Sequence, residues 1–258
     1  MVIIGLVMGG ILVGRNLVEA AGIKAQIDQI IKYEVAVNTF RGKYGYLPGD
    51  IPDPAASQFG FVSRGIYAGT GDGNGVIEGL WNYSAGTNSP NRNAAGETIL
   101  FWRDLSTAHL IEDTFNTATA TVIPTITTAQ LPLYFPASKF GGGYITAYGY
   151  HNFSFGVARL TGSSIGNANC ASSNWCYNLF SVAQMYAIDS KMDDGLPASG
   201  KITAGGSFSY VSPTQTNAQA PASGTCADNG NVGGKVMTYS VTYPGNGLNC
   251  YFSYYSNN

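Results

Sequence analysis

The chain has 258 residues, a formal net charge of −2 and only 11% charged residues. This balance offers no basic footprint for specific binding of nucleic acid, and cytosolic enzymes usually carry more charge. The 34 glycines and 17 tyrosines indicate a polar but uncharged surface, which is typical of a secreted structural protein. The length fits one large domain or two small ones, and we expect a single core.

The first predicted element is one long helix over residues 1–46, which contains no proline. Its apolar head, MVIIGLVMGGILVG, ends at Arg15, so it is shorter than the roughly 20 apolar residues that span a bilayer. Between Ile23 and Phe40 the apolar residues recur at spacings of three and four, opposite charged residues, as in an amphipathic helix. The apolar-headed stripe covers about 41 of these residues, and at 1.5 Å per residue it would be roughly 60 Å long, about twice the width of a small domain.

We therefore divide the helix into an amphipathic half, residues 23–46, and an apolar half, residues 1–22, that needs lipid or neighbouring subunits to cover it. The apolar side chains that we expect to pack in an assembly are Ile3, Ile4, Leu6, Val7, Ile11, Leu12, Val13, Leu17 and Val18. Gly9, Gly10 and Gly14 interrupt this half. Glycine costs about 1 kcal/mol in a helix interior, so we predict local melting of the helix there in a filament.

Residues 47–93 are dense in Gly, Pro and Asn and are predicted to form an extended loop region. The motif TGDGNGVIEG within it partly fits the calcium-loop template, with Asp72 and Asn74 at the third and fifth positions. Thr70 and Trp81 stand where the template has its first and last acidic ligands. The alternative to a metal site is a simple turn rich in Gly and Asn.

An ion in this loop would need further oxygen ligands. The predicted calcium ligands are Asp72, Asn74 and Glu78, and Asp50 or Asp53 could contribute from the preceding segment. Calcium is the one cofactor that the sequence suggests. A second acidic run, with Asp189, Asp193 and Asp194, is interpreted as a helix end and a turn rather than as a cation site.

Two further helices are predicted, over residues 96–112 and 177–192, from apolar residues at helical spacing. Five runs favour strands: LPLYF (131–135), GYITAYGY (143–150), FSFGVARL (153–160), KVMTYSVTY (235–243) and LNCYFSY (248–254). Alternation in KVMTYSVTY fits a sheet with one buried face. The predicted fold class is α+β, a long N-terminal helix packed on an antiparallel sheet with long Gly/Pro-rich loops, in which residues 47–258 form the head.

The four cysteines lie in the second half of the chain and allow three pairings. We favour Cys170 with Cys176, which closes a small loop, and Cys226 with Cys250, which ties a Gly-rich loop to the C-terminal strand. The alternative is four buried thiols. Zinc is disfavoured because the chain has no C-x-x-C motif.

The residues point away from catalysis. The chain has two histidines and no G-x-S-x-G, H-E-x-x-H or phosphate-loop motif, so we predict that it is not an enzyme and keep a secreted hydrolase as the alternative. The tyrosines of the predicted strands could present a surface for glycans or other subunits, although strand packing explains most of them.

The opening IIGLVMGGILVGRNLVEAAGIKAQIDQIIKYEVAVNTFRGKYGYLPGD resembles type IV pilins and the related pseudopilins of bacterial secretion systems. The resemblance covers residues 1–50 and weakens beyond them. It implies a long helix on an antiparallel sheet and a structural subunit that first resides in the inner membrane. Bundled apolar helix halves would then assemble identical copies into an extracellular filament on the bacterial surface. The alternative within the family is a minor pilin or pseudopilin of a type II secretion or DNA-uptake system that acts as a tip adhesin.

This chain departs from the family pattern at its start. Family members carry a basic leader, a processing site and a glutamate upstream of the apolar run, whereas here Met1 begins directly in that run. We expect these features upstream of the sequence considered. Many members also have a proline in the apolar stretch, where this chain offers glycines.

Overall fold

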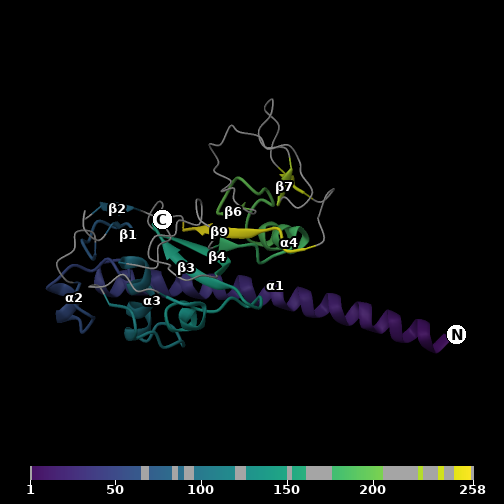
Figure 1. Ribbon diagram of the computed structural model, residues 1–258, viewed down its shortest axis with the longest axis horizontal. Coiled ribbons are helices and arrows are strands. Elements are labelled where there is room, and N and C mark those ends of the chain that lie inside the picture. The colour runs from purple at the N-terminus through teal and green to yellow at the C-terminus, as the bar shows by residue number, and fades with distance from the viewer. Residues whose placement is uncertain are drawn as a thin grey trace, which may run out of the picture.

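The computed structural model describes residues 2–64, 70–82, 87–89, 96–119, 126–149, 153–160, 176–205, 226–228, 238–240 and 247–256. The predicted α+β class is confirmed. A long N-terminal helix, α1, lies against an antiparallel sheet, and its N-terminal part projects beyond the rest of the molecule (Figure 1).

Helix α1 spans Val2–Tyr44, 43 residues, or about 65 Å at 1.5 Å per residue. One face of its second half is buried, including Ile30, Val37 and Phe40, which recur at the helical spacing seen in the sequence. The helix ends where Gly45 adopts a φ of 80°, a conformation that glycine adopts without steric cost. Within the described part of the chain, we find no helix that combines the length and the apolar character needed to cross a bilayer.

The segment after α1 contains more regular structure than the predicted loop. It holds the short helix α2 (Ala55–Gln58) and the antiparallel pair β1 (Gly79–Asn82) and β2 (Thr87–Ser89). Helix α3 (Glu97–Thr107) follows and ends earlier than predicted, because the chain turns at His109, whose φ is 57°. Leu110 and Ile111 still pack against the core beyond this turn.

Two other predicted elements differ from the structure. The run LPLYF is not a strand: Thr128–Leu133 form a 3₁₀ helix, η1, which opens with a capping box between Thr127 and Gln130. Helix α4 (Val182–Met192) begins later than predicted. Ser181 is its N-cap and pairs with Gln184 in a second capping box, while Phe180 is held in a bridge to Cys250. Local side-chain hydrogen bonds thus set both helix starts.

The main sheet has five antiparallel strands: β3 (Tyr144–Tyr148), β4 (Ser154–Leu160), β5 (Cys176–Tyr177), β6 (Ile202–Gly205) and β9 (Tyr251–Tyr255). Four of them follow the order β3-β4-β9-β6, and β5 pairs with the end of β4. A separate antiparallel pair joins β7 (Ala227–Asp228) to β8 (Thr238–Tyr239). Of the predicted strand 235–243 the structure describes residues 238–240, and β8 lies within them.

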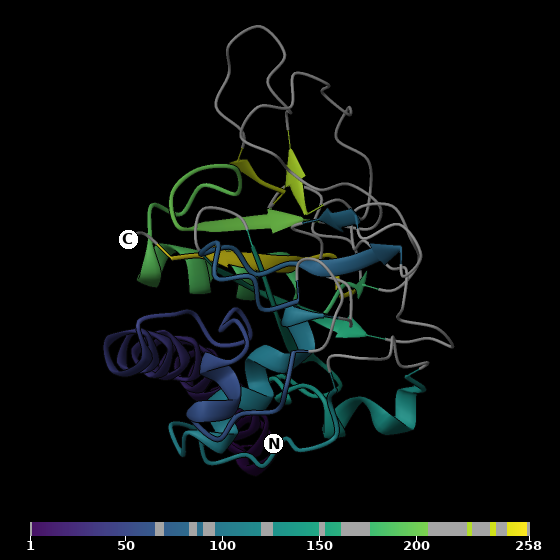
Figure 2. The same ribbon diagram turned by 90° about the vertical axis from the view of Figure 1, so that its left-hand side faces the viewer.

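The two faces of the sheet differ in side-chain size along one row of paired residues. Phe155, Tyr254 and Ile202 are paired across β4, β9 and β6, and Phe155 contacts Tyr33 of α1 and Trp102 of α3. Both helices therefore cover this face (Figure 2). Thr146, Gly156, Ser253 and Thr203 form the corresponding row on the other face. Strands β3, β4, β6 and β9 are buried over most of their length, so both faces of this sheet are largely covered.

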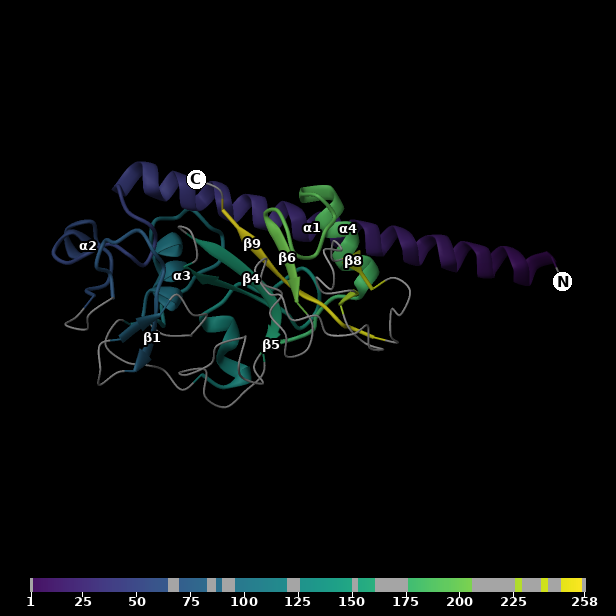
Figure 3. The ribbon, with the colours of Figure 1, turned by 90° about the horizontal axis from the view of Figure 1, so that it is seen from above.

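The hydrophobic core is one cluster that extends from Ile23 of α1 to Tyr254 of β9. Helix α4 packs beside α1 and next to β6 (Figure 3). The predicted disulfide Cys226–Cys250 is confirmed, and it joins the β7–β8 pair to the start of β9. Cys170 lies outside the described residues, so its pairing with Cys176 stays a prediction.

Candidate functional site

The most distinctive surface is the part of α1 that no other element covers. We call residues 9–18 the stem, and each of its side chains is exposed. Ile11, Leu12, Val13, Leu17 and Val18 are 66–73% exposed. These are the described members of the predicted assembly set. Ile3, Ile4, Leu6 and Val7 also belong to α1, but their side chains lie outside the described ones. An apolar surface of this kind marks a site of contact with protein or membrane.

Gly9, Gly10 and Gly14 lie inside the continuous helix of the single chain. A methyl group added at any of them would meet nothing within 4 Å, so these glycines have open space around them. The predicted melting concerns the assembled filament and stays a prediction.

Hydrogen bonds of polar side chains fix the position of α1 along its own axis relative to the head. Gln26 accepts hydrogen bonds from the Ser138 hydroxyl (2.6 Å) and the Lys139 backbone N–H (3.0 Å). Gln29 donates to the Ala137 carbonyl at 2.8 Å. Because buried polar groups are costly to leave unpaired, these bonds fix how far the stem projects.

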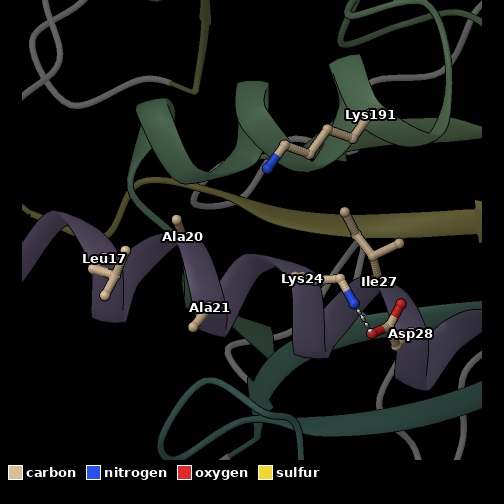
Figure 4. Close-up of a pocket in the computed structure, with 7 residues that line it drawn as sticks. All are labelled: Leu17, Ala20, Ala21, Lys24, Ile27, Asp28 and Lys191. Carbon is tan, nitrogen blue, oxygen red and sulfur yellow. Dashed lines mark hydrogen bonds and ion pairs between the residues drawn. The ribbon is translucent and has the colours of Figure 1, made fainter.

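A groove begins where the stem meets the head, between α1 and α4. Its volume is about 590 Å³, and the residues that line it are Leu17, Ala20, Ala21, Lys24, Ile27, Asp28 and Lys191. The Lys191 side chain extends from α4 towards α1, and Lys24 and Asp28 form an ion pair at one end (Figure 4). Glu19 of α1 accepts a hydrogen bond from Gln184 of α4 at 2.9 Å, which ties the two walls together.

A second candidate site lies at the other end of the head, where three carboxylates converge. One oxygen from each of Asp50, Asp72 and Glu97 lies within 4.8 Å of the others. Asp50 and Glu97 are buried, and Asp72 is exposed. Asp50 accepts hydrogen bonds from the backbone N–H groups of Gly73 and Gly75, at 2.8 and 2.9 Å.

Glu97 is held in the same manner, because it accepts from the backbone N–H groups of Gly71 (2.7 Å) and Glu78 (2.9 Å). Burial, together with the nearby Asp50 charge, raises the pKa of Glu97 to about 9. Burial raises the pKa of Asp50 to about 6. At neutral pH the cluster can therefore hold a proton, and a divalent cation offers the alternative means of balancing its charge.

The structure brings the predicted calcium ligands together, but not as the template arranges them. The Asn74 amide N–H group donates to Asp72 at 3.1 Å and to Glu78 at 3.2 Å, and its oxygen accepts from the Val76 N–H. Asn74 thus bridges the carboxylates. Calcium bound by Asp72, Asn74 and Glu78 stays a prediction. The structure places the anticipated Asp50 beside Asp72, and it adds Glu97 as a further carboxylate that could reach an ion there.

Sequence reasoning missed Glu97. It stands at the first position of α3, where an acidic residue is ordinarily explained by the helix dipole, so no local signal marks it as buried. Asp53, the other acid considered, lies apart from the cluster and accepts hydrogen bonds from Ser57, Ser63 and the Arg64 N–H.

The acidic run at the end of α4 also forms a cluster, of Asp189, Asp193 and Asp194. Its oxygens accept hydrogen bonds from groups of the following turn, among them the Gly195 and Leu196 N–H groups. Asp189 in addition accepts from the Tyr239 hydroxyl at 2.6 Å. These bonds fit the interpretation of the run as a helix end.

Comparison of the chain with protein-family models, with curated proteins and with solved structures finds no match. What the chain does must therefore be argued from its own residues.

Proposed function

We propose that the protein is the structural subunit of a type IV pilus-like filament, and that its subunits assemble through the N-terminal halves of α1. The observation that supports this proposal is the division of α1 into two parts. Residues 23–40 contribute one buried face to the core of the head, whereas every side chain from Gly9 to Val18 is exposed.

In water, an isolated subunit in this form would leave the apolar side chains of its stem exposed, which is unfavourable. Burial of a Val, Leu or Ile side chain stabilises by about 1.5–3 kcal/mol, and the stem exposes five such residues within eight positions of one helix. A filament of parallel subunits would bury the stems against one another and would leave the heads facing water. The resemblance of residues 1–50 to pilins supports the same arrangement.

The stem also suits residence in the inner membrane before assembly, since an apolar helix segment can be buried in lipid as well as in protein. In this proposal the subunits leave the membrane and enter an extracellular filament. Contacts of the heads with surfaces or glycans are a further role, and assembly does not depend on them. The acidic cluster has a supporting role at most, in ordering the loop between α1 and α3.

The test is assembly of the full chain. Detergent is removed from purified protein, and the product is examined by sedimentation and electron microscopy. Uniform fibres are expected, and Leu17→Gln together with Val18→Gln should abolish them while the circular dichroism of the subunit is unchanged. Monomers that stay soluble without detergent would contradict the proposal, and hydrolysis of glycan or peptide panels by such monomers would favour the enzyme instead.

A further inference from the structure

We propose that the groove between α1 and α4 is the docking site for the projecting helix of a second copy of this chain, and that Arg15 of the second copy pairs with Asp28 in the groove. This inference rests on the proposed function and adds to it a defined contact and register.

The shape of the groove suits a helix. Six of its seven lining residues belong to α1 and one, Lys191, to α4, and the Glu19–Gln184 hydrogen bond fixes the two helices to each other. Small and apolar residues, Ala20, Ala21 and Ile27, line it, and small residues allow two helix backbones to approach closely. The groove begins at Leu17, so it is continuous with the apolar surface of the stem (Figure 4).

The charged residues of the groove indicate where a basic side chain can pair, because two of them, Lys24 and Lys191, are basic and one, Asp28, is acidic. Arg15 is the single charged residue between Val2 and Val18, and no described residue pairs with it in the subunit. Asp28 is the one acidic residue that lines the groove. Its partner there is Lys24, at 3.2 Å in an ion pair whose side chains are 77% and 60% exposed. An exposed pair of this kind contributes little, so Asp28 can exchange it for an arginine, which pairs with a carboxylate through two hydrogen bonds.

The pairing defines how the two helices are staggered. If parallel helices bring Arg15 of one copy to Asp28 of the other, they are shifted by 13 residues (28 − 15), or about 20 Å. The apolar run that ends at Arg15 then lies along the groove.

The same shift places Val18 of one copy level with Ile31 of the other. Ile31 and Val35 are 46% and 58% exposed. They lie on the α1 face that continues from Lys24 and Asp28, because positions three, four and seven residues apart share a helix face. The stagger therefore gives these exposed apolar side chains of the head an apolar neighbour.

The first experiment measures the concentration at which the full chain polymerises. Arg15→Glu and Asp28→Arg should each raise this concentration about tenfold or more, as expected when a hydrogen bond between charged groups is lost. The combined variant restores the pair in reverse and should polymerise within about threefold of the wild type. Glu112→Gln is the matched control: it breaks the exposed ion pair between Lys32 and Glu112, which does not line the groove, so it should polymerise as readily as the wild type.

The second experiment tests the register. Subunits carrying Val18→Cys are mixed with subunits carrying Ile31→Cys, polymerised and oxidised, and a cross-linked heterodimer is expected. Mixtures of Val18→Cys with Thr39→Cys, an exposed position eight residues further along α1, should give several-fold less.

Three outcomes would overturn the inference. Fibres that form equally well in both charge-reversal variants would overturn the docking site and leave the proposed function standing. Absence of wild-type fibres would remove both. If the groove instead takes an anionic lipid, the Lys24→Gln/Lys191→Gln variant would lose binding to phosphatidylglycerol vesicles but not to phosphatidylcholine vesicles, and the charge reversals would leave polymerisation unchanged.

Discussion

The buried ion pair between Arg64 and Asp104 gives the sharpest prediction about stability. Both side chains are 1% exposed, and the Arg64 Nη2 atom lies 2.6 Å from Asp104 Oδ2. The same carboxylate oxygen accepts from the Gly49 N–H at 2.7 Å, and Arg64 Nε donates to the Ile51 carbonyl at 3.0 Å. The pair therefore fastens the loop after α1 to helix α3.

Asp104→Asn preserves the size of the side chain but leaves the guanidinium of Arg64 buried without a counter-charge. Removal of one partner of a buried pair costs about 3–5 kcal/mol. For a chain of this length each kcal/mol corresponds to roughly 2–4 °C in Tm, so thermal unfolding followed by circular dichroism should show a decrease of roughly 6–20 °C.

Two matched variants separate the buried charge from other effects. Arg64→Met combined with Asp104→Leu removes both charges and should cost less than Asp104→Asn alone, since apolar replacement of a whole pair is often nearly neutral. Asp28→Asn, which breaks the exposed pair with Lys24, should change stability by less than about 1 kcal/mol. The reasoning is refuted if Asp104→Asn melts within about 2 °C of the wild type, or if the double variant loses as much stability as Asp104→Asn does.

Three further predictions concern the acidic cluster and the disulfide. Because the pKa of Glu97 is about 9 in the folded protein and about 4.3 in unfolded chains, the unfolding free energy of metal-free protein should fall as pH rises from 6.5 to 8.5, by at most about 1.4 kcal/mol per pH unit. Urea titrations at several pH values should show this slope, and Glu97→Gln should flatten it. Calcium added to chelator-treated protein should raise Tm, and Asp72→Asn should make that increase smaller. A titration that shows neither heat nor a thermal shift would exclude calcium binding at this site. Replacement of Cys226 and Cys250 by alanine opens a loop with a sequence separation of 24 and should lower the unfolding free energy, measured in urea, by about 3 kcal/mol. An unchanged urea midpoint would show that the disulfide does not stabilise the fold.

The sequence predicted the elements whose signals are local and periodic. Helix α1 ends within two residues of its predicted end, at Tyr44, because apolar spacing and the glycines that follow it are both local features. The strands around Ile145, Phe155 and Phe252 were also predicted, as was the Cys226–Cys250 bond. By contrast, the run 131–135 has strand-like composition, but the capping box at Thr127 starts a 3₁₀ helix there.

Long-range polar pairing was not predictable. Arg64 and Asp104 are 40 residues apart, and Glu97 binds backbone groups 26 and 19 residues before it. A charged residue in a loop or at a helix start is usually solvated, so nothing in its neighbourhood indicates burial. The acidic cluster could be predicted only in part, through Asp72 and Asp50, because its third member reaches it through the packing of α3 in the core.

The lateral bonds of α1 have a mechanical consequence. Gln26 and Gln29 form hydrogen bonds with residues 137–139 beside the helix. Tyr33 and Phe40 pack against aromatic side chains of the head. A force applied to the stem along the helix axis would load all of these contacts together in shear, rather than opening them one after another. The helix could not slide out of the head without breaking these contacts, so in the proposed filament each chain would bear tension as one rigid unit.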